Sequence, residues 1–361
     1  MGEPTNPETM TERVTQWVQD HALIVVGGGL IALVAAVTMA IALVAGGTDD
    51  SSPPDDTVKG DTATGDTTSG TGSPPPPNAS PSGTGTTLPA GEEGSLIAMK
   101  VDNAEPARPQ IGLDAARWIV ETPVEGGITR FLAFFPPGET LVGPVRSARP
   151  IDVDLVGLLS DTLVSTGGRP FVLGALTGHG FTLIGHDPLD SPFQTLERPS
   201  PHNLFISLSE VPAPSDVASG FPTGDLPTGE SAQGFEVPYA TPVTWTYAEG
   251  VYTRSDGGEG FEVLPAFDAE LQPLEVDTVV VMAVNQRSAG YQDANDVEVP
   301  TFDVIGSERL WVYHQGNLIQ GVWSRASHSD GYQFQTADGN PIGLPEGRTF
   351  VHLLPRQLLD G

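Results

Sequence analysis

The sequence contains no cysteine and almost no lysine. Without thiols the chain cannot form disulfides, bind zinc through cysteine or use a cysteine nucleophile. Its two lysines are Lys59 and Lys100, and neither follows a glycine-rich loop, so there is no Walker-type phosphate loop. We therefore expect no bound cofactor and no metal site.

Basic residues are also scarce. There are 46 acidic residues against 16 basic ones, which gives a formal net charge of −30. A chain this acidic repels phosphate backbones, so we expect no nucleic-acid partner. The 43 glycines and 34 prolines are too many for a helical bundle and favour strands, turns and linkers.

Residues 22–47 form one run of 26 residues without a charge. As a helix the run would be about 39 Å long, enough to cross a hydrocarbon core of about 30 Å. The preceding residues 1–21 hold four acids and one base and lack the basic stretch of a cleaved signal, so we predict an uncleaved transmembrane helix behind a short tail. Small residues at every fourth position could pair two such helices into a homodimer; they are Gly28, Ala32, Ala36 and Ala40.

A disordered stalk is predicted over residues 48–93. Of the 43 residues from 48 to 90, 30 are threonine, serine, proline or glycine. Such a stretch cannot bury enough apolar surface to fold. We expect it to hold the rest of the chain off the outer face of the cell membrane, as a single-pass protein with its C-terminal domains extracytoplasmic.

The sequence of the remaining residues, 94–361, predicts an α+β protein with two folded parts. Residues 94–210 mix short apolar strands with helices over 152–159 and 170–176, which predicts a mixed α/β domain. Residues 211–242 are rich in proline and glycine and predict a linker. Residues 243–361 show paired strand patterns around tight turns, which predicts a mainly antiparallel β domain.

Half of the arginines lie in the first folded part. Seven of the 14 fall between residues 94 and 210, and Arg146 and Arg149 stand three apart in the segment GPVRSARP, residues 143–150. Arginine offers a planar charged fork that fits phosphate or carboxylate. We predict that one concave face gathers the anion-binding residues, with Glu121 or Glu125 at its edge; they are Arg130, Arg146, Arg149, Arg198, His202 and Asn203. The alternative is that each arginine pairs with its own nearby carboxylate.

These segments resemble the YerB-like bacterial lipoproteins, a family of unknown function with an N-terminal and a C-terminal domain. The matching pieces include residues 102–103, 107–110, 125–131, 143–150, 201–204, 321–323 and 345–355. The resemblance implies an extracytoplasmic location and supplies no activity. Since this chain has no lipid-bearing cysteine, the predicted spanning helix would replace the lipid anchor.

Three functions remain open at this stage. The first is a binding protein for an anionic cell-wall or lipid-linked component. The second is an envelope hydrolase or transferase acting on a phosphorylated glycan or lipid-linked substrate, in which Glu121 or Glu125 with His202 supplies acid and base while Arg146 and Arg149 hold the phosphate. The third is a protein-interaction scaffold.

Overall fold

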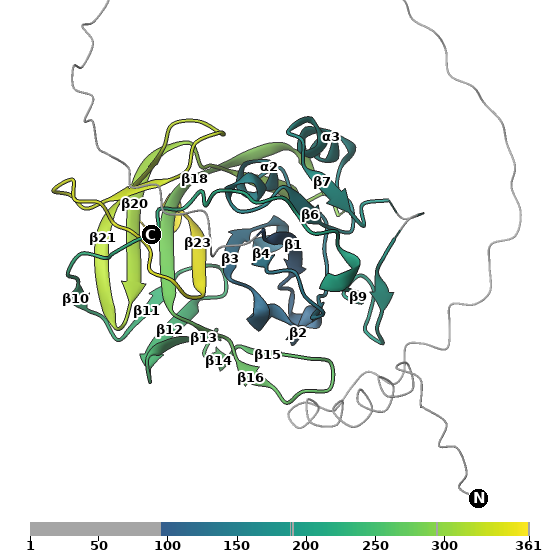
Figure 1. The fold of residues 1–361 in the computed structure, drawn as a ribbon, viewed down its shortest axis with the longest axis horizontal. Helices are drawn as coiled ribbons and strands as arrows, with labels where there is room; N and C mark the ends of the chain where they lie inside the picture. The colour runs from purple at the N-terminus through teal and green to yellow at the C-terminus, as the bar shows by residue number, and fades with distance from the viewer. Residues whose placement is uncertain (1–94, 188, 190, 294, 360–361) are drawn as a thin grey trace, which may run out of the picture. The chain divides into compact units, whose positions relative to one another are not determined.

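The computed structural model describes residues 95–359, apart from 188, 190 and 294 (Figure 1). The predicted tail, transmembrane helix, pairing residues and stalk, over 1–21, 22–47 and 48–93, lie outside the described residues. Within residues 95–359, no helix is long and apolar enough to cross a membrane.

The expected α+β fold with a mixed α/β first domain was wrong, because the described chain is mostly β. Its two α-helices are short, α2 (Asp152–Leu155) and α3 (Pro170–Gly178). The helix predicted over 152–159 ends early and continues as a 3-10 turn, Val156–Leu158. The other 3-10 turns are Glu105–Ala107, Leu113–Ala115, Glu125–Gly127, Leu208–Glu210 and Arg356–Leu358.

A twelve-stranded sheet forms the centre of the described chain, and both predicted parts contribute strands to it. Its spatial order is β10 (Glu230–Ser231), β21 (Asn317–Arg325), β20 (Gly306–His314), β18 (Thr278–Gln292), β23 (Thr349–Pro355), β3 (Trp118–Pro123), β4 (Thr129–Phe135), β1 (Ile97–Asp102), β6 (Thr162–Val164) and β7 (Thr182–Ile184). β19 (Glu298–Asp303) pairs with β18, and β22 (Gln333–Gln335) pairs with β21.

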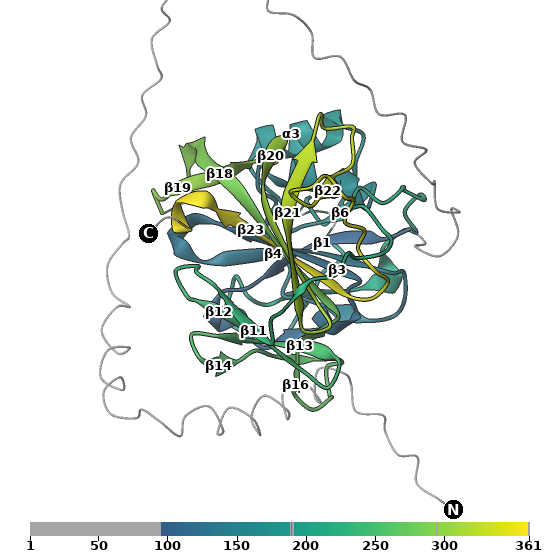
Figure 2. The same cartoon turned by 90° about the vertical axis from the view of Figure 1, so that its left-hand side faces the viewer.

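Three smaller sheets complete the fold. The largest contains β11 (Gly234–Val237), β12 (Val243–Ala248), β13 (Val251–Asp256), β14 (Glu259–Gly260) and β17 (Glu275–Val276). The other two contain β16 (Gln272–Pro273), β15 (Glu262–Leu264) and β2 (Gln110–Ile111), and β5 (Leu141–Val142), β9 (Leu204–Ser207) and β8 (Gln194–Thr195). Figure 2 shows the sheet of β11 to β14 on one side of the large sheet, whereas α2 and α3 lie on the other side in Figure 1.

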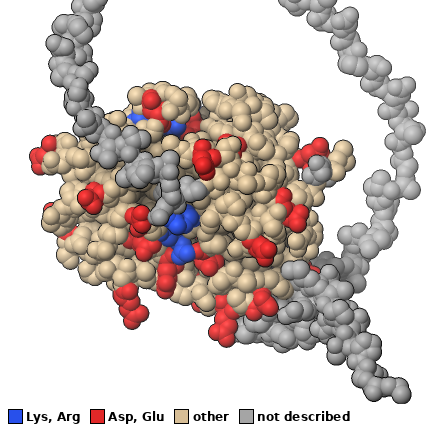
Figure 3. Space-filling model, viewed as in Figure 1, with Lys and Arg blue, Asp and Glu red and all other residues tan. Residues whose placement is uncertain are grey.

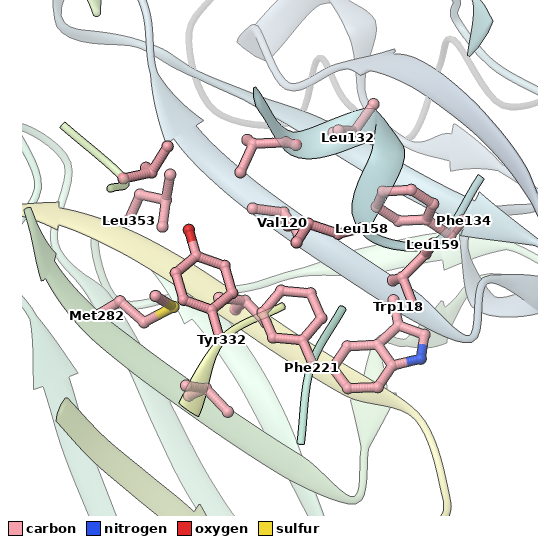
Figure 4. Close-up of a cluster of buried hydrophobic side chains, with 14 of the residues drawn as sticks. Trp118, Val120, Leu132, Phe134, Leu158, Leu159, Phe221, Met282, Tyr332 and Leu353 are labelled. Carbon is pink, nitrogen blue, oxygen red and sulfur yellow. The ribbon is translucent and has the colours of Figure 1, made fainter. Parts of the chain in front are cut away.

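Successive side chains along the central strands point to opposite faces of the sheet, and each face has its own hydrophobic core. In β3, Trp118 and Val120 point into the core beneath α2 and α3, and Ile119 points into the core shared with the five-stranded sheet. The first core also receives Phe221 and Tyr332 from the later part of the chain (Figure 4). Because β1, β3, β4 and β23 are covered on both faces, their sequences are mostly apolar rather than alternating.

The seam between the earlier and later parts is a pair of parallel strands. β23 pairs with β3 from Thr349↔Trp118 to His352↔Glu121 and with β18 along its whole length. The polypeptide between the earlier and the later part, residues 211–242, includes a mostly exposed stretch at 212–217 that has no regular secondary structure.

Cleavage within residues 211–242 should therefore leave the two fragments bound to each other. The ladder between β3 and β23 and the shared core remain intact after a single cut in this stretch. Limited proteolysis followed by size-exclusion chromatography should give one native peak that resolves into two bands on a denaturing gel. Two separate native peaks would contradict the shared sheet, while the domain boundary itself stays a prediction.

Candidate anion site

The segment 143–150 lies across the carboxyl end of β1. The amide of Asp102 donates to the Pro144 carbonyl (2.9 Å), and the amide of Arg146 donates to the Lys100 carbonyl (2.9 Å). Gly143 allows the start of this segment to pack closely against β9, since a Cβ there would lie 2.6 Å from the Phe205 ring and 2.9 Å from the Leu204 carbonyl oxygen. The segment thereby sets Arg146 beside the end of β1.

Asp102 joins two of the predicted site residues. Its Oδ2 lies 2.7 Å from Nδ1 of His202 and 3.0 Å from Nε of Arg146, and its side chain is only 1% exposed. Arg146 also reaches the Pro201 carbonyl at 3.4 Å, so the loop carrying His202 is held on the arginine segment.

Arg149 is held by two acids. Its guanidinium donates from Nε to Glu125 Oε2 at 3.0 Å and from Nη2 to Oε1 of the same carboxylate. Its backbone amide donates to Asp152 (2.6 Å), and the other oxygen of Asp152 accepts from Lys100 (2.9 Å). Burial lowers the pKa of Lys100, and Asp152 only partly offsets that shift.

Arg130 is the least satisfied cation of the group. It is 3% exposed, and its nearest acid is Glu125, 3.5 Å from Nη2. Its Nε and Nη1 find no hydrogen-bond acceptor among the described residues. Burial, together with the nearby charges of Arg149 and Arg146, lowers the pKa of Arg130 to about 10, so the side chain is still charged at neutral pH.

These residues form what we call the arginine cluster. Its members lie close enough to influence one another's charge; they are Lys100, Asp102, Glu125, Arg130, Arg146, Arg149, Asp152 and His202. Four cations meet three carboxylates, which leaves one positive charge when His202 is neutral. This contrasts with the face in Figure 3, where acidic side chains greatly outnumber basic ones.

The later part of the chain reaches the cluster through Tyr291, near the end of β18. Tyr291 interacts electrostatically with Arg149, and its ring packs edge-on against Phe171 (5.1 Å between centroids). Arg169 stacks on the same ring at 5.6 Å and donates to the Gln292 carbonyl (2.7 Å). Residues 165–169 link β6 to α3, so the cluster borders the carboxyl ends of two parallel strands, β1 and β6.

Two predicted site residues have structural partners instead. Arg198 donates to the carbonyls of Ala107 and Pro109, both at 2.8 Å, and lies over the Phe205 ring. Asn203 contributes its backbone carbonyl, which accepts from the amide of Leu196 (3.0 Å). Both residues fasten the loop that carries His202.

Glu121 lies on the opposite face of the sheet from the arginine cluster. In β3 it follows Ile119 into the second core, whereas Arg130 pairs in register with Thr122 and Asp102 on the other face. The sequence-based hypothesis that Glu121 and His202 act together as acid and base is therefore not supported by this arrangement.

The surroundings of Glu121 form a second polar network, fully buried at the seam. Arg254 donates to both carboxylate oxygens at 2.8 and 3.0 Å, and Nδ1 of His352 lies 3.1 Å from Oε2. Arg254 also donates to Asp256 (2.6 Å). Burial favours the neutral acid, but Arg254 and His352 outweigh it and hold the pKa of Glu121 far below its usual range. We read this network as structural.

Two surface hollows are found on the described residues, and one of them adjoins the cluster at Glu125. One of about 550 Å³ lies between residues 123–129 and the β18–β19 hairpin, and Glu125 lines it. The other, of about 510 Å³, is lined by residues 115–117, 275–277 and 346–348. Neither hollow is lined by Arg146, Arg149 or His202. No group of three metal-ligating side chains suited to an ion occurs within the described part of the chain.

The sequence pointed to three of the clustered arginines, to Glu125 and to His202, but it missed Lys100 and Asp102. Lys100 and Asp152 are 52 residues apart, and Asp102 is 100 residues from His202. The signal that could have found Lys100 is a single lysine inside the apolar run SLIAMKV, where a charge must have a buried partner.

Fold and site together define a mostly β protein with a partly buried arginine cluster in its earlier part, next to Tyr291 of the later part. Residues 83–219 match the model described as "Protein of unknown function (DUF3048) N-terminal domain", and residues 235–351 match the C-terminal domain of the same family. The chain belongs to the DUF3048 family, and the resemblance to YerB-like proteins is confirmed.

The chain is similar to one relative and to one solved structure. The chain is 26% identical over 280 residues to "Putative lipoprotein YerB" of Bacillus subtilis (strain 168), which covers 72% of this chain and 81% of the relative. The crystal structure of the YerB protein from Bacillus subtilis matches with a TM-score of 0.60 and 22% identity, over 73% of this chain and 91% of that one. The latter likeness supports the fold.

Proposed function

We propose that this protein is a membrane-attached extracytoplasmic protein that binds an anionic cell-envelope ligand at the arginine cluster. Membership of the family and the lipoprotein name of the relative support the location. The uncharged segment 22–47 supports attachment without a lipid, since the chain has no cysteine to carry one. The ligand class follows from the chemistry of the cluster.

The observation that carries the binding proposal is the unfilled hydrogen-bonding capacity of Arg130. Burying a guanidinium without partners costs several kcal/mol, so such groups are normally paired or hold a ligand. Nε and Nη1 of Arg130 offer two donors to an incoming phosphate or carboxylate, and the cluster carries one uncompensated positive charge. A bound anion would accept hydrogen bonds from these two donors and would also neutralise the excess positive charge.

Replacing Arg130 by glutamine should abolish anion-induced stabilisation without lowering the stability of the ligand-free protein. The substitution removes a buried charge that lacks a full partner, so folding loses little. For the wild-type full-length chain in detergent, inorganic phosphate at about 100 times its dissociation constant should add about 2.7 kcal/mol to the unfolding free energy. Thermal unfolding with and without phosphate measures both quantities.

The matched control is Arg117→Gln, which removes an exposed arginine outside the cluster and should leave the phosphate effect unchanged. If Arg130→Gln instead lowers stability by several kcal/mol while phosphate still stabilises the variant, Arg130 is a structural residue and the binding proposal is wrong.

A further inference from the structure

We propose that His202 and Asp102 form an acid–base pair that hydrolyses a phosphodiester held by the arginine cluster. This inference rests on the proposed function, because it assumes that the cluster binds the phosphate group. It adds a reaction, a substrate class and a role for His202.

The geometry fixes which ring nitrogen of His202 is free to accept a proton. Oδ2 of Asp102 lies 2.7 Å from Nδ1, and a carboxylate can only accept at that distance. Nδ1 therefore carries the hydrogen and Nε2 of a neutral ring carries the lone pair. Nε2 has no hydrogen-bond partner among the residues described, and the side chain remains 15% exposed, so water can reach it.

One carboxylate oxygen links the base to the anion site. The same Oδ2 of Asp102 that orients His202 lies 3.0 Å from Nε of Arg146. Asp102 also pairs in register with Arg130 on the neighbouring strand β4. The Asp102 carboxylate thus positions both the imidazole of His202 and the guanidinium of Arg146. A base and a phosphate-binding group that act on one ligand need such a fixed relative position.

The position at the end of the strands agrees with a ligand site. In open α/β sheets, ligands bind outside the carboxyl ends of parallel strands, and β1 and β6 form one parallel pair within this mixed sheet. Asp102 is the last residue of β1, and the amide of Thr166, just beyond the end of the parallel strand β6, donates to the Arg146 carbonyl (3.1 Å). The pair therefore stands where a bound ligand would lie.

The charge of the cluster selects a phosphodiester over a phosphomonoester. Lys100, Arg130, Arg146 and Arg149 are opposed by Asp102, Glu125 and Asp152, so one positive charge is left uncompensated. A phosphodiester carries one negative charge and neutralises the cluster. A monoester dianion would leave an extra negative charge in a partly buried site, which is costly.

The proposed reaction consumes one water. Nε2 of His202 takes a proton from the water as its oxygen bonds to phosphorus, and the bond between phosphorus and the leaving oxygen breaks. The imidazolium then returns the proton to the leaving oxygen. The products are an alcohol and a phosphomonoester, and Arg130 and Arg146 stabilise the charge on the phosphoryl oxygens during the step.

The test uses the full-length protein in detergent with bis(p-nitrophenyl) phosphate as the probe. Release of p-nitrophenol should fall by about 100-fold or more in His202→Gln, the usual contribution of a general base. His179→Gln is the matched control, because His179 is exposed at the far end of α3 and should retain full activity. Phosphate-induced thermal stabilisation is measured on the same variants.

The outcomes separate the two proposals. Turnover that is lost in His202→Gln while phosphate still stabilises that variant supports the inference. Phosphate stabilisation without wild-type turnover, or turnover that survives His202→Gln, overturns the inference and leaves anion binding standing. The absence of phosphate stabilisation in the wild type overturns both.

Discussion

Replacing Glu121 by alanine should lower the free energy of unfolding by about 3–5 kcal/mol, the usual cost of stranding one partner of a buried ion pair. The loss leaves Arg254 and His352 in the core of the seam without their shared acceptor. The guanidinium of Arg254 would still face Asp256 and the rings of Phe131 and Phe261, but these do not replace the two bonds to Glu121.

Denaturant unfolding of the full-length chain measures this effect. The matched control is Glu308→Ala, since Glu308 makes a solvent-exposed pair with Arg356 (3.5 Å) that should contribute no more than about 1 kcal/mol. A Glu121→Ala variant as stable as the control would show that the buried network contributes little to holding the two parts together.

Stability should also fall steeply as the pH drops from about 7 towards 5, through protonation of His352. The indole N–H of Trp245 donates to Nε2 of His352 (2.9 Å), and an indole nitrogen cannot accept, so the native ring must be unprotonated there. Burial lowers the pKa of His352 below its ordinary value of 6.5, against the opposing effect of Glu121.

The sign follows from proton binding. In acid the unfolded chain takes up a proton at His352 that the folded chain resists, so the native state is favoured above the unfolded pKa and loses that advantage as the pH falls. Melting temperatures at pH 7.5 and 5 should differ strongly in the wild type. His352→Gln should be less stable at pH 7.5 but show a smaller difference, and an unchanged difference would assign the acid sensitivity to other groups.

Local sequence patterns were sufficient to find much of the arginine cluster. Glycine and proline around Arg130, Arg146 and Arg149 mark loops with a fixed shape, and the structure brings these three together with Glu125 and His202. The local sequence did not predict that Arg198 and Asn203 have structural partners. A side chain bound to a backbone carbonyl has the same local sequence as one that faces a ligand.

The sheet order was beyond the reach of local patterns. The apolar patterns of residues 94–210 predicted short strands, but they did not predict which strands would lie side by side. β23 pairs with β3 across more than 200 residues, and no periodicity within either strand encodes that choice. The sequence also did not predict that Glu121 and Arg130 lie on opposite faces of the sheet. Strands that are buried on both faces show no alternation of polar and apolar residues from which the direction of a side chain could be inferred.

The central claim is that Arg130 donates to a bound anion, and its side-chain N–H signal tests this most directly. In full-length protein labelled with ¹⁵N-arginine, the Nε–H resonance that disappears in Arg130→Gln identifies the residue. Titration with inorganic phosphate should shift this resonance to saturation, with the same dissociation constant that thermal stabilisation gives. A resonance that stays in place while phosphate stabilises the protein would put the anion elsewhere and contradict the account.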